Sequence, residues 1–67
     1  MTQILAGRSI LVTGGASGIG RAVALRSADA GAAITVTDIN VEAGAQVVDE
    51  IVGNSGQAQF VRLDAFH

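Results

Sequence analysis

Residues 13–20 read TGGASGIG, and four of these eight residues are glycine. The stretch follows the apolar run Ile10-Leu11-Val12, so Ser9 to Thr13 is predicted to be a β-strand. Alanine, leucine, valine and arginine dominate residues 18–30. This composition favours a helix, and Gly31 is placed to end it. The sequence therefore predicts a glycine-rich loop between a strand and the helix that follows it.

The same alternation continues along the chain. Ile34 to Asp38 is a second β-branched run, Asn40 can cap a second helix, and Phe60 to Leu63 is predicted to be a third strand. The stretch from Gly53 through Asn54, Ser55 and Gly56 is expected to end the second helix. Its apolar side is predicted along Val41, Ala45, Val48 and Val52, with Gly44 and Ile51 beside them.

Strands that alternate with helices of this length indicate an α/β protein with a parallel sheet and right-handed crossovers. Two such crossovers in one direction place both helices on one face. Because Ile10, Leu11 and Val12 are apolar at consecutive positions, we expect the other face to be bare and apolar, with an open edge at the first strand. Residues 1–67 are thus expected to be the N-terminal βαβαβ part of a larger domain, truncated after its third strand.

Length and composition exclude several classes of protein. The chain of 67 residues allows one domain. It has no cysteine and a single histidine, His67, so no zinc–thiolate site or histidine cluster is expected. Four arginines, no lysine and a net charge of −2 argue against nucleic-acid binding. No apolar run is long enough for a membrane span, and the N-terminus lacks the pattern of a signal peptide, so a cytoplasmic location is expected.

The glycine-rich loop has the setting of a phosphate site. A helix N-terminus presents unpaired N–H groups and partial positive charge, and glycines let the backbone approach a pyrophosphate. Gly14, Gly18 and Gly20 give the spacing G-x-x-x-G-x-G, and Ser17 adds a hydroxyl. A Walker A loop is excluded because Arg21 and Ala22 follow and no lysine exists. The alternative interpretation is a plain flexible turn.

Asp38 ends the second strand, 18 residues after Gly20. A dinucleotide-binding fold uses an acid at about 20 residues from its loop to accept hydrogen bonds from the adenosine ribose. The carboxylate would repel a 2′-phosphate, and its neighbours Ala16, Thr37 and Ile39 are not basic, so NAD is predicted rather than NADP. Otherwise Asp38 only terminates a strand. Asp64, at the end of the third strand, could reach the adenine amino group or could be a solvated strand-end residue.

These features together resemble the short-chain dehydrogenase/reductase family, because TGGASGIG matches its T-G-x-x-x-G-x-G loop at every fixed position. The resemblance extends over the helix RAVALRSADAGA, the strand ITVTDI and the RLDA that closes the third strand. It implies a Rossmann-type doubly wound sheet. It also implies a cofactor site in which Asp38 and Ile39 hold the adenosine ribose, and Asp64 and Ala65 flank the adenine. The loop residues that would line the pyrophosphate and the adjacent ribose are Gly14, Ser17, Gly18, Ile19 and Gly20.

The family's chemistry uses a Tyr-x-x-x-Lys pair and a serine, yet this sequence has neither tyrosine nor lysine. We therefore predict no catalytic residue among residues 1–67 and expect the chain to be inactive alone. The resemblance implies the NAD-binding portion of an oxidoreductase that moves hydride between nicotinamide and an alcohol or ketone. The alternatives are a stand-alone nucleotide-binding module, a fragment that self-associates or finds a complementing partner through its bare sheet face, and a domain that binds S-adenosylmethionine, against which the loop motif argues.

Overall fold

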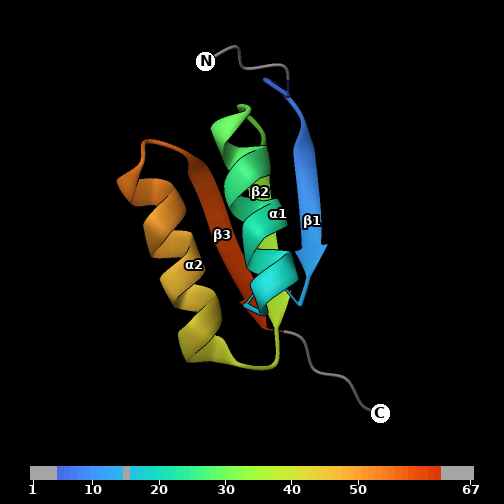
Figure 1. Cartoon of the computed structure of the whole chain (residues 1–67), viewed down its shortest axis with the longest axis vertical. Helices are drawn as coiled ribbons and strands as arrows, with labels where there is room; N and C mark the ends of the chain where they lie inside the picture. Colours follow the sequence, from blue (N-terminus) through green and yellow to red (C-terminus); the bar gives the residue numbers. More distant parts are fainter. Residues whose placement is uncertain (1–4, 15, 63–67) are drawn as a thin grey trace.

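The structure is a computed structural model that describes residues 5–14 and 16–62. Three strands and two helices alternate along the chain (Figure 1). They are β1 (Ser9–Thr13), α1 (Gly18–Asp29), β2 (Ala33–Asp38), α2 (Val41–Gly53) and β3 (Gln57–Arg62). No helix among the described residues is long and apolar enough to cross a membrane.

The strands form one parallel sheet in the order β1-β2-β3. The register aligns Thr13 with Thr37 in the first pair of strands and Asp38 with Arg62 in the second. Both helices lie on the same face of the sheet (Figure 1). The predicted α/β class, with a βαβαβ order and two helices on one face, is therefore confirmed.

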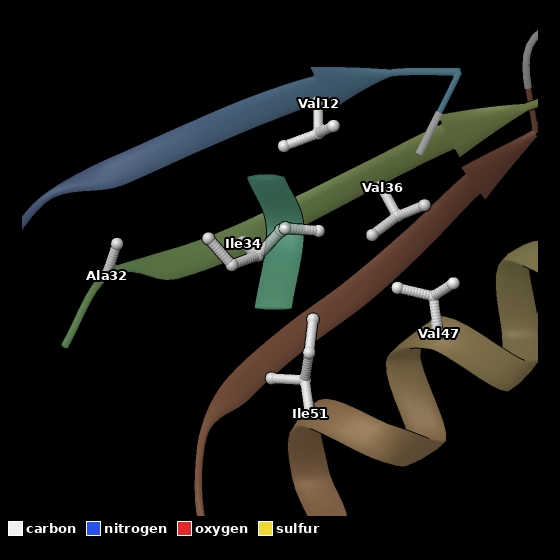
Figure 2. Close-up of a cluster of buried hydrophobic side chains, with 7 residues drawn as sticks. Val12, Ala32, Ile34, Val36, Val47 and Ile51 are labelled. Atoms are coloured by element: carbon white, nitrogen blue, oxygen red, sulfur yellow. The ribbon is translucent and has the colours of Figure 1, made fainter. Parts of the chain in front are cut away.

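The core lies between this face of the sheet and the two helices. Ile34 and Val36 of β2 point into it, where Val47 and Ile51 of α2 meet them (Figure 2). Val12 of β1 joins the cluster, with Ala24 of α1 and Ala32 before β2. The small alanine contacts let α1 approach the sheet closely, and the larger side chains of α2 fill the remaining space. Burial of these groups is the main stabilising contribution in a chain of this size.

The two helices end in the same hydrogen-bonding motif with different residues at its key position. After α1, Gly31 has φ 103°, and the amides of Gly31 and Ala32 donate to the carbonyls of Ala28 and Ser27. This is a Schellman motif, which requires a left-handed residue after the helix. The prediction that Gly31 ends the first helix is confirmed.

After α2, the left-handed residue is Ser55, with φ 68°. The amides of Ser55 and Gly56 donate to the carbonyls of Val52 and Ile51, which completes a second Schellman motif. The predicted helix end at Gly53 is confirmed, but the glycines on either side do not occupy the left-handed position. Asn40 begins the helix as predicted, because its side chain accepts a hydrogen bond from the amide of Ala43.

The predicted apolar side of the second helix is confirmed where Gly44 and Ile51 were expected beside the stripe, but it is wrong along most of the stripe itself. The buried residues of α2 are Gly44, Val47 and Ile51, whereas Val41 and Val52 remain 45% and 54% exposed. Gly44 lies against the ring of Phe60 of β3, where an added Cβ would have no room, so this side of the helix packs closely on the sheet. Of the predicted stripe, only Val48 packs against the core.

The third strand begins earlier than Phe60, the predicted start. Gln57, Ala58 and Gln59 pair in register with residues 33–35 of β2. The glutamines are exposed and Ala58 is half-buried, so this half of the strand has only one covered face. The prediction missed this half of the strand because it relied on a run of apolar residues, and Gln57 and Gln59 are polar.

The face of the sheet away from the helices is uncovered by the described residues, but the prediction that it is apolar is wrong. Alternation along the strands places Leu11 and Val61 there, 64% and 49% exposed. Most of its other residues are polar, and the Gln59 amide donates to Thr35 Oγ1 at 3.1 Å. The remaining positions on this face are Ser9, Thr13, Ala33, Thr37 and Gln57.

Candidate nucleotide-binding site

The carboxyl ends of β1 and β2 bring the predicted site residues to one edge of the sheet. β1 ends at Thr13 and leads into the loop before α1, and β2 ends at Asp38, one strand away. In open parallel sheets, this edge is where ligands bind. The strand order therefore places the loop and the acid next to each other, as the sequence predicts.

Gly14 makes the turn out of β1. Its φ is 70°, a left-handed conformation that residues with a Cβ rarely adopt, and its amide donates to the Thr37 carbonyl at 2.8 Å. This bond holds the start of the loop against the end of β2. A Cβ at Gly14 would meet no described atom within 4 Å, so the conformation, rather than a lack of space, requires glycine here.

Ser17 caps the N-terminus of α1. Its hydroxyl donates to the Gly14 carbonyl at 2.8 Å and accepts a longer bond, 3.4 Å, from the Gly20 amide. The backbone of Ser17 closes the turn, since its amide also donates to the Gly14 carbonyl. The hydroxyl therefore stabilises the shape of the loop and the first turn of the helix. Its predicted contact with a pyrophosphate stays a prediction.

The next two amides of α1 are available to a ligand. The N–H groups of Gly18 and Ile19 have no acceptor among the described residues, because the cap uses Gly20 and the first helical bond uses Arg21. A Cβ built on Gly18 would meet only open space within 4 Å. The first turn of α1 contains no acidic residue, so nothing there offsets the partial positive charge of the helix end. The arrangement fits an anion of the size of a phosphate.

Asp38 lies at the end of β2, beside this loop, and is partly buried. Its Oδ2 accepts a hydrogen bond from the Ala16 amide at 3.2 Å, and its Oδ1 accepts one from the Asn40 amide at 2.9 Å. A carboxylate can accept about four hydrogen bonds, so two lone-pair sites remain for another donor. The acid thus faces the loop, with capacity left for the hydroxyl groups of a ribose.

Two aliphatic side chains stand out at this edge of the sheet. Ile19 is 83% exposed and Ile39 is 69% exposed. Both follow directly after a residue of the predicted site, Gly18 in one case and Asp38 in the other. Asp64 and Ala65, the predicted adenine contacts, lie outside the described residues, so their roles stay predictions.

Sequence reasoning missed two features of this edge. The first is the bond from Ala16 to Asp38, which depends on the path of the loop. The second is Arg62, the register partner of Asp38 on β3. The predicted neighbours of the acid had been Ala16, Thr37 and Ile39, so a cation on the adjacent strand was not considered. The sequence did contain a signal for this cation, because Arg62 lies near the end of the predicted third strand and Asp38 lies at the end of the second.

Other candidate sites are absent or lie elsewhere in the described part of the chain. Within residues 5–14 and 16–62, no three histidine, cysteine or acidic side chains come together as metal ligands. A groove of about 310 Å³ runs between the C-terminal halves of α1 and α2 and is lined by residues that include Leu25, Asp29, Ile51 and Asn54. It lies toward the opposite edge of the sheet from the glycine loop.

The comparison with protein families is decisive once this geometry is known. Residues 8–66 match the family model described as short chain dehydrogenase. The chain belongs to the short-chain dehydrogenase family. The resemblance seen in the loop motif is therefore confirmed over nearly the whole chain.

Several curated relatives of this chain are dehydrogenases. It is 48% identical over 64 residues to 2,5-dichloro-2,5-cyclohexadiene-1,4-diol dehydrogenase of Sphingobium indicum, covering 96% of this chain and 26% of the relative. It is 45% identical over 60 residues to 7α-hydroxysteroid dehydrogenase of Escherichia coli, covering 90% and 24%. The chain thus spans about a quarter of the length of the relatives it matches.

Solved structures of the family have the same fold in this region. A 7α-hydroxysteroid dehydrogenase complexed with NADH and 7-oxo glycochenodeoxycholic acid superposes with a TM-score of 0.89 and 43% identity, covering 94% of this chain and 25% of that one. A metagenomic short-chain oxidoreductase in complex with NADP superposes with a TM-score of 0.88 and 36% identity, covering 94% and 28%. The predicted Rossmann-type fold is confirmed, and structures similar to this chain occur with either nicotinamide cofactor.

Proposed function

We propose that this chain is the NAD-binding portion of a short-chain oxidoreductase. The single observation that carries the proposal is made at the carboxyl ends of β1 and β2: the Gly18 and Ile19 amides have no acceptor among the described residues, and the Asp38 carboxylate is hydrogen-bonded to the same loop. The amides suit a pyrophosphate, and the carboxylate suits the adenosine ribose. The bound cofactor would supply the hydride chemistry between nicotinamide and an alcohol or ketone.

In this proposal, the residues of the chain bind and orient the cofactor. Gly14 and Ser17 hold the shape of the loop, and Gly18 keeps its rim free of a side chain. Ile19 and Ile39 are exposed at the rim and would exclude water from the two ends of the adenosine diphosphate. No proton transfer is assigned to these residues, because the sequence has neither the tyrosine nor the lysine on which the family's chemistry depends.

The preference for NAD over NADP rests on charge. Asp38 would place its carboxylate where a 2′-phosphate lies against the ribose, and both of its oxygens already accept amide hydrogen bonds that hold it in this position. The register places Arg62 on the next strand, so a cation is close enough in the fold to reduce this discrimination. We propose that the carboxylate dominates, since it faces the loop directly.

Two measurements test the proposal. Hydride-transfer assays of this chain with NAD and a panel of alcohols are expected to show no turnover, and measurable activity would contradict the prediction that these 67 residues contain no catalytic group. Replacement Asp38→Ala is expected to weaken ADP binding by about 1–3 kcal/mol, the cost of losing a charged hydrogen-bond acceptor. Equal ADP affinity in the variant would contradict the ribose role of Asp38.

Three further expectations from the sequence stay predictions. We propose that the chain forms the first part of a dinucleotide-binding domain, that its uncovered sheet face mediates self-association or binds a complementing segment, and that the protein resides in the cytoplasm. Leu11 and Val61 support an interface on that face because both are large, apolar and exposed. Sedimentation at increasing concentration tests the second expectation, and a monomer throughout would contradict self-association.

A further inference from the structure

Asp38 connects the two crossovers of the fold at the candidate site. Its Oδ2 accepts a hydrogen bond from Ala16, 22 residues earlier in the loop before α1, and its Oδ1 accepts one from Asn40 at the start of α2. One partly buried carboxylate therefore holds the backbone of both connections, before α1 and before α2. A role limited to ribose binding does not require the bond to the loop.

The described residues of the loop have few other restraints. The Gly14 amide is bonded to the Thr37 carbonyl, and Ser17 closes the turn on Gly14 itself. Among the described residues, Ala16 is the loop position held by a side chain from another strand. Glycine-rich backbone is costly to order, and a hydrogen bond from an amide to a carboxylate is about twice as strong as a neutral one. The Asp38 bond is thus the restraint best suited to fixing the middle of the loop.

We propose that Asp38 is a positioning residue for the phosphate-binding loop, in addition to any contact with the ribose. This inference rests on the proposed function, because it assigns the loop to phosphate. The carboxylate holds Ala16, and through it the direction of the following amides of Gly18 and Ile19. Loss of the carboxylate then disorders the phosphate site even for a ligand that has no ribose.

Inorganic pyrophosphate separates this role from ribose binding by the sign of the effect. It carries negative charge and no ribose. If Asp38 serves the ribose alone, removing its charge reduces repulsion and strengthens pyrophosphate binding. If Asp38 positions the loop, removing it weakens pyrophosphate binding despite the reduced repulsion. The two roles therefore predict changes in opposite directions.

The variant for this test is Asp38→Asn, which removes the charge and keeps the size of the side chain. Its single carbonyl oxygen can replace only one of the two acceptors. Asp49→Asn is the matched control, because Asp49 is an exposed acid on α2 and no loop contact involves it. Amide shifts of Gly18 and Ile19 in NMR spectra report pyrophosphate binding, and hydrogen exchange reports the Ala16 amide.

In Asp38→Asn, we expect the dissociation constant for pyrophosphate to rise by about threefold or more, and Ala16 exchange to accelerate by about tenfold, as for loss of one hydrogen bond. Gly14 should keep its protection, since its acceptor is a strand carbonyl, and this shows that the variant is folded. Asp49→Asn should neither raise the dissociation constant for pyrophosphate nor accelerate exchange of the Ala16 amide. A second variant, Asp38→Ala, should give the same signs.

Tighter or unchanged pyrophosphate binding in Asp38→Asn, with Ala16 exchange unchanged, would overturn the positioning role. Failure of the proposed function looks different: pyrophosphate would then leave the Gly18 and Ile19 amides of the unmodified chain unshifted. In that case accelerated Ala16 exchange in the variant would still support the positioning of the loop by Asp38, and unchanged exchange would overturn it.

Discussion

Gly44 of α2 lies directly against the ring of Phe60 of β3. A Cβ built on Gly44 would stand 2.1 Å from Phe60 Cε1 and 2.5 Å from Cδ1. No side chain fits in that space, so the absence of a Cβ is what lets the helix lie on the strand. The contact determines which side of α2 faces the sheet, and it lies two residues before Arg62, the end of β3 at the candidate site.

Gly44→Ala should therefore destabilise the fold. Alanine improves helix propensity by about 1 kcal/mol over glycine, but the added methyl group must displace an aromatic ring in the core, which costs about 1–3 kcal/mol. We expect a net loss of up to about 2 kcal/mol in the free energy of unfolding, measured by urea denaturation.

Gly53→Ala is the matched control for this substitution. It lies in the same helix, and a Cβ there would meet nothing within 4 Å, so propensity alone should act and the variant should be at least as stable as the unmodified chain. Equal stability of the two alanine variants would show that Phe60 moves aside freely.

Gly31 after α1 and Ser55 after α2 both have left-handed backbone, so exchanging glycine and serine should change the free energy of unfolding in opposite directions at the two helix ends. Ser55→Gly should stabilise the protein by about 1 kcal/mol, because a left-handed residue with a Cβ carries a cost that glycine avoids. Gly31→Ser should destabilise it by a similar amount or more, since φ is 103° there. Urea denaturation of both variants checks the pair, and a loss of stability in Ser55→Gly would show that the serine hydroxyl has a structural role.

Substitution of the buried residue Thr37 by valine should stabilise the protein. Its side chain is only 8% exposed, and Oγ1 has no hydrogen-bond partner among the described residues. Thr37→Val removes a buried hydroxyl and keeps the branched shape, so the free energy of unfolding should rise by about 1 kcal/mol. The backbone carbonyl that accepts from Gly14 is unaffected. A clear loss of stability in thermal or urea unfolding would contradict the prediction and would indicate a partner outside the described residues.

The sequence predicted the elements whose signals are local. The β1 strand is bounded as predicted because its apolar run ends at consecutive glycines, and α2 begins after Asn40 because the capping side chain is adjacent in sequence. The loop and Asp38 came together as predicted because successive parallel strands present their carboxyl ends at the same edge.

The sequence did not predict features that depend on contacts between distant residues. Periodicity favoured the valines of α2 as its buried side, but a glycine without hydrophobicity occupies the closest contact with Phe60. The bond between Ala16 and Asp38 joins residues 22 positions apart through a backbone amide, and side-chain patterns carry no signal of backbone donors. The left-handed conformation of Ser55 was not predicted, because glycine usually takes this position and Gly53 and Gly56 lie close by in the sequence.

The ion pair between Arg21 and Glu50 was also not predicted, because the two residues are 29 positions apart in the sequence. The Arg21 guanidinium donates two hydrogen bonds to the Glu50 carboxylate and joins α1 to α2. The hydrogen bond with Glu50, followed by the attraction of its charge, raises the pKa of Arg21. Both side chains are exposed, so solvent and salt weaken the pair, and the core contacts rather than this pair position the helices.

Titration of NAD and NADP against this chain tests the central claim most directly. Calorimetry gives the two affinities, and the amide shifts of Gly18 and Ile19 show where the ligand binds. We expect tighter binding of NAD than of NADP in the unmodified chain, and loss of this preference in Asp38→Ala. Tighter binding of NADP by the unmodified chain would contradict the role assigned to Asp38, and saturating NAD that leaves both amides unshifted would contradict the site itself.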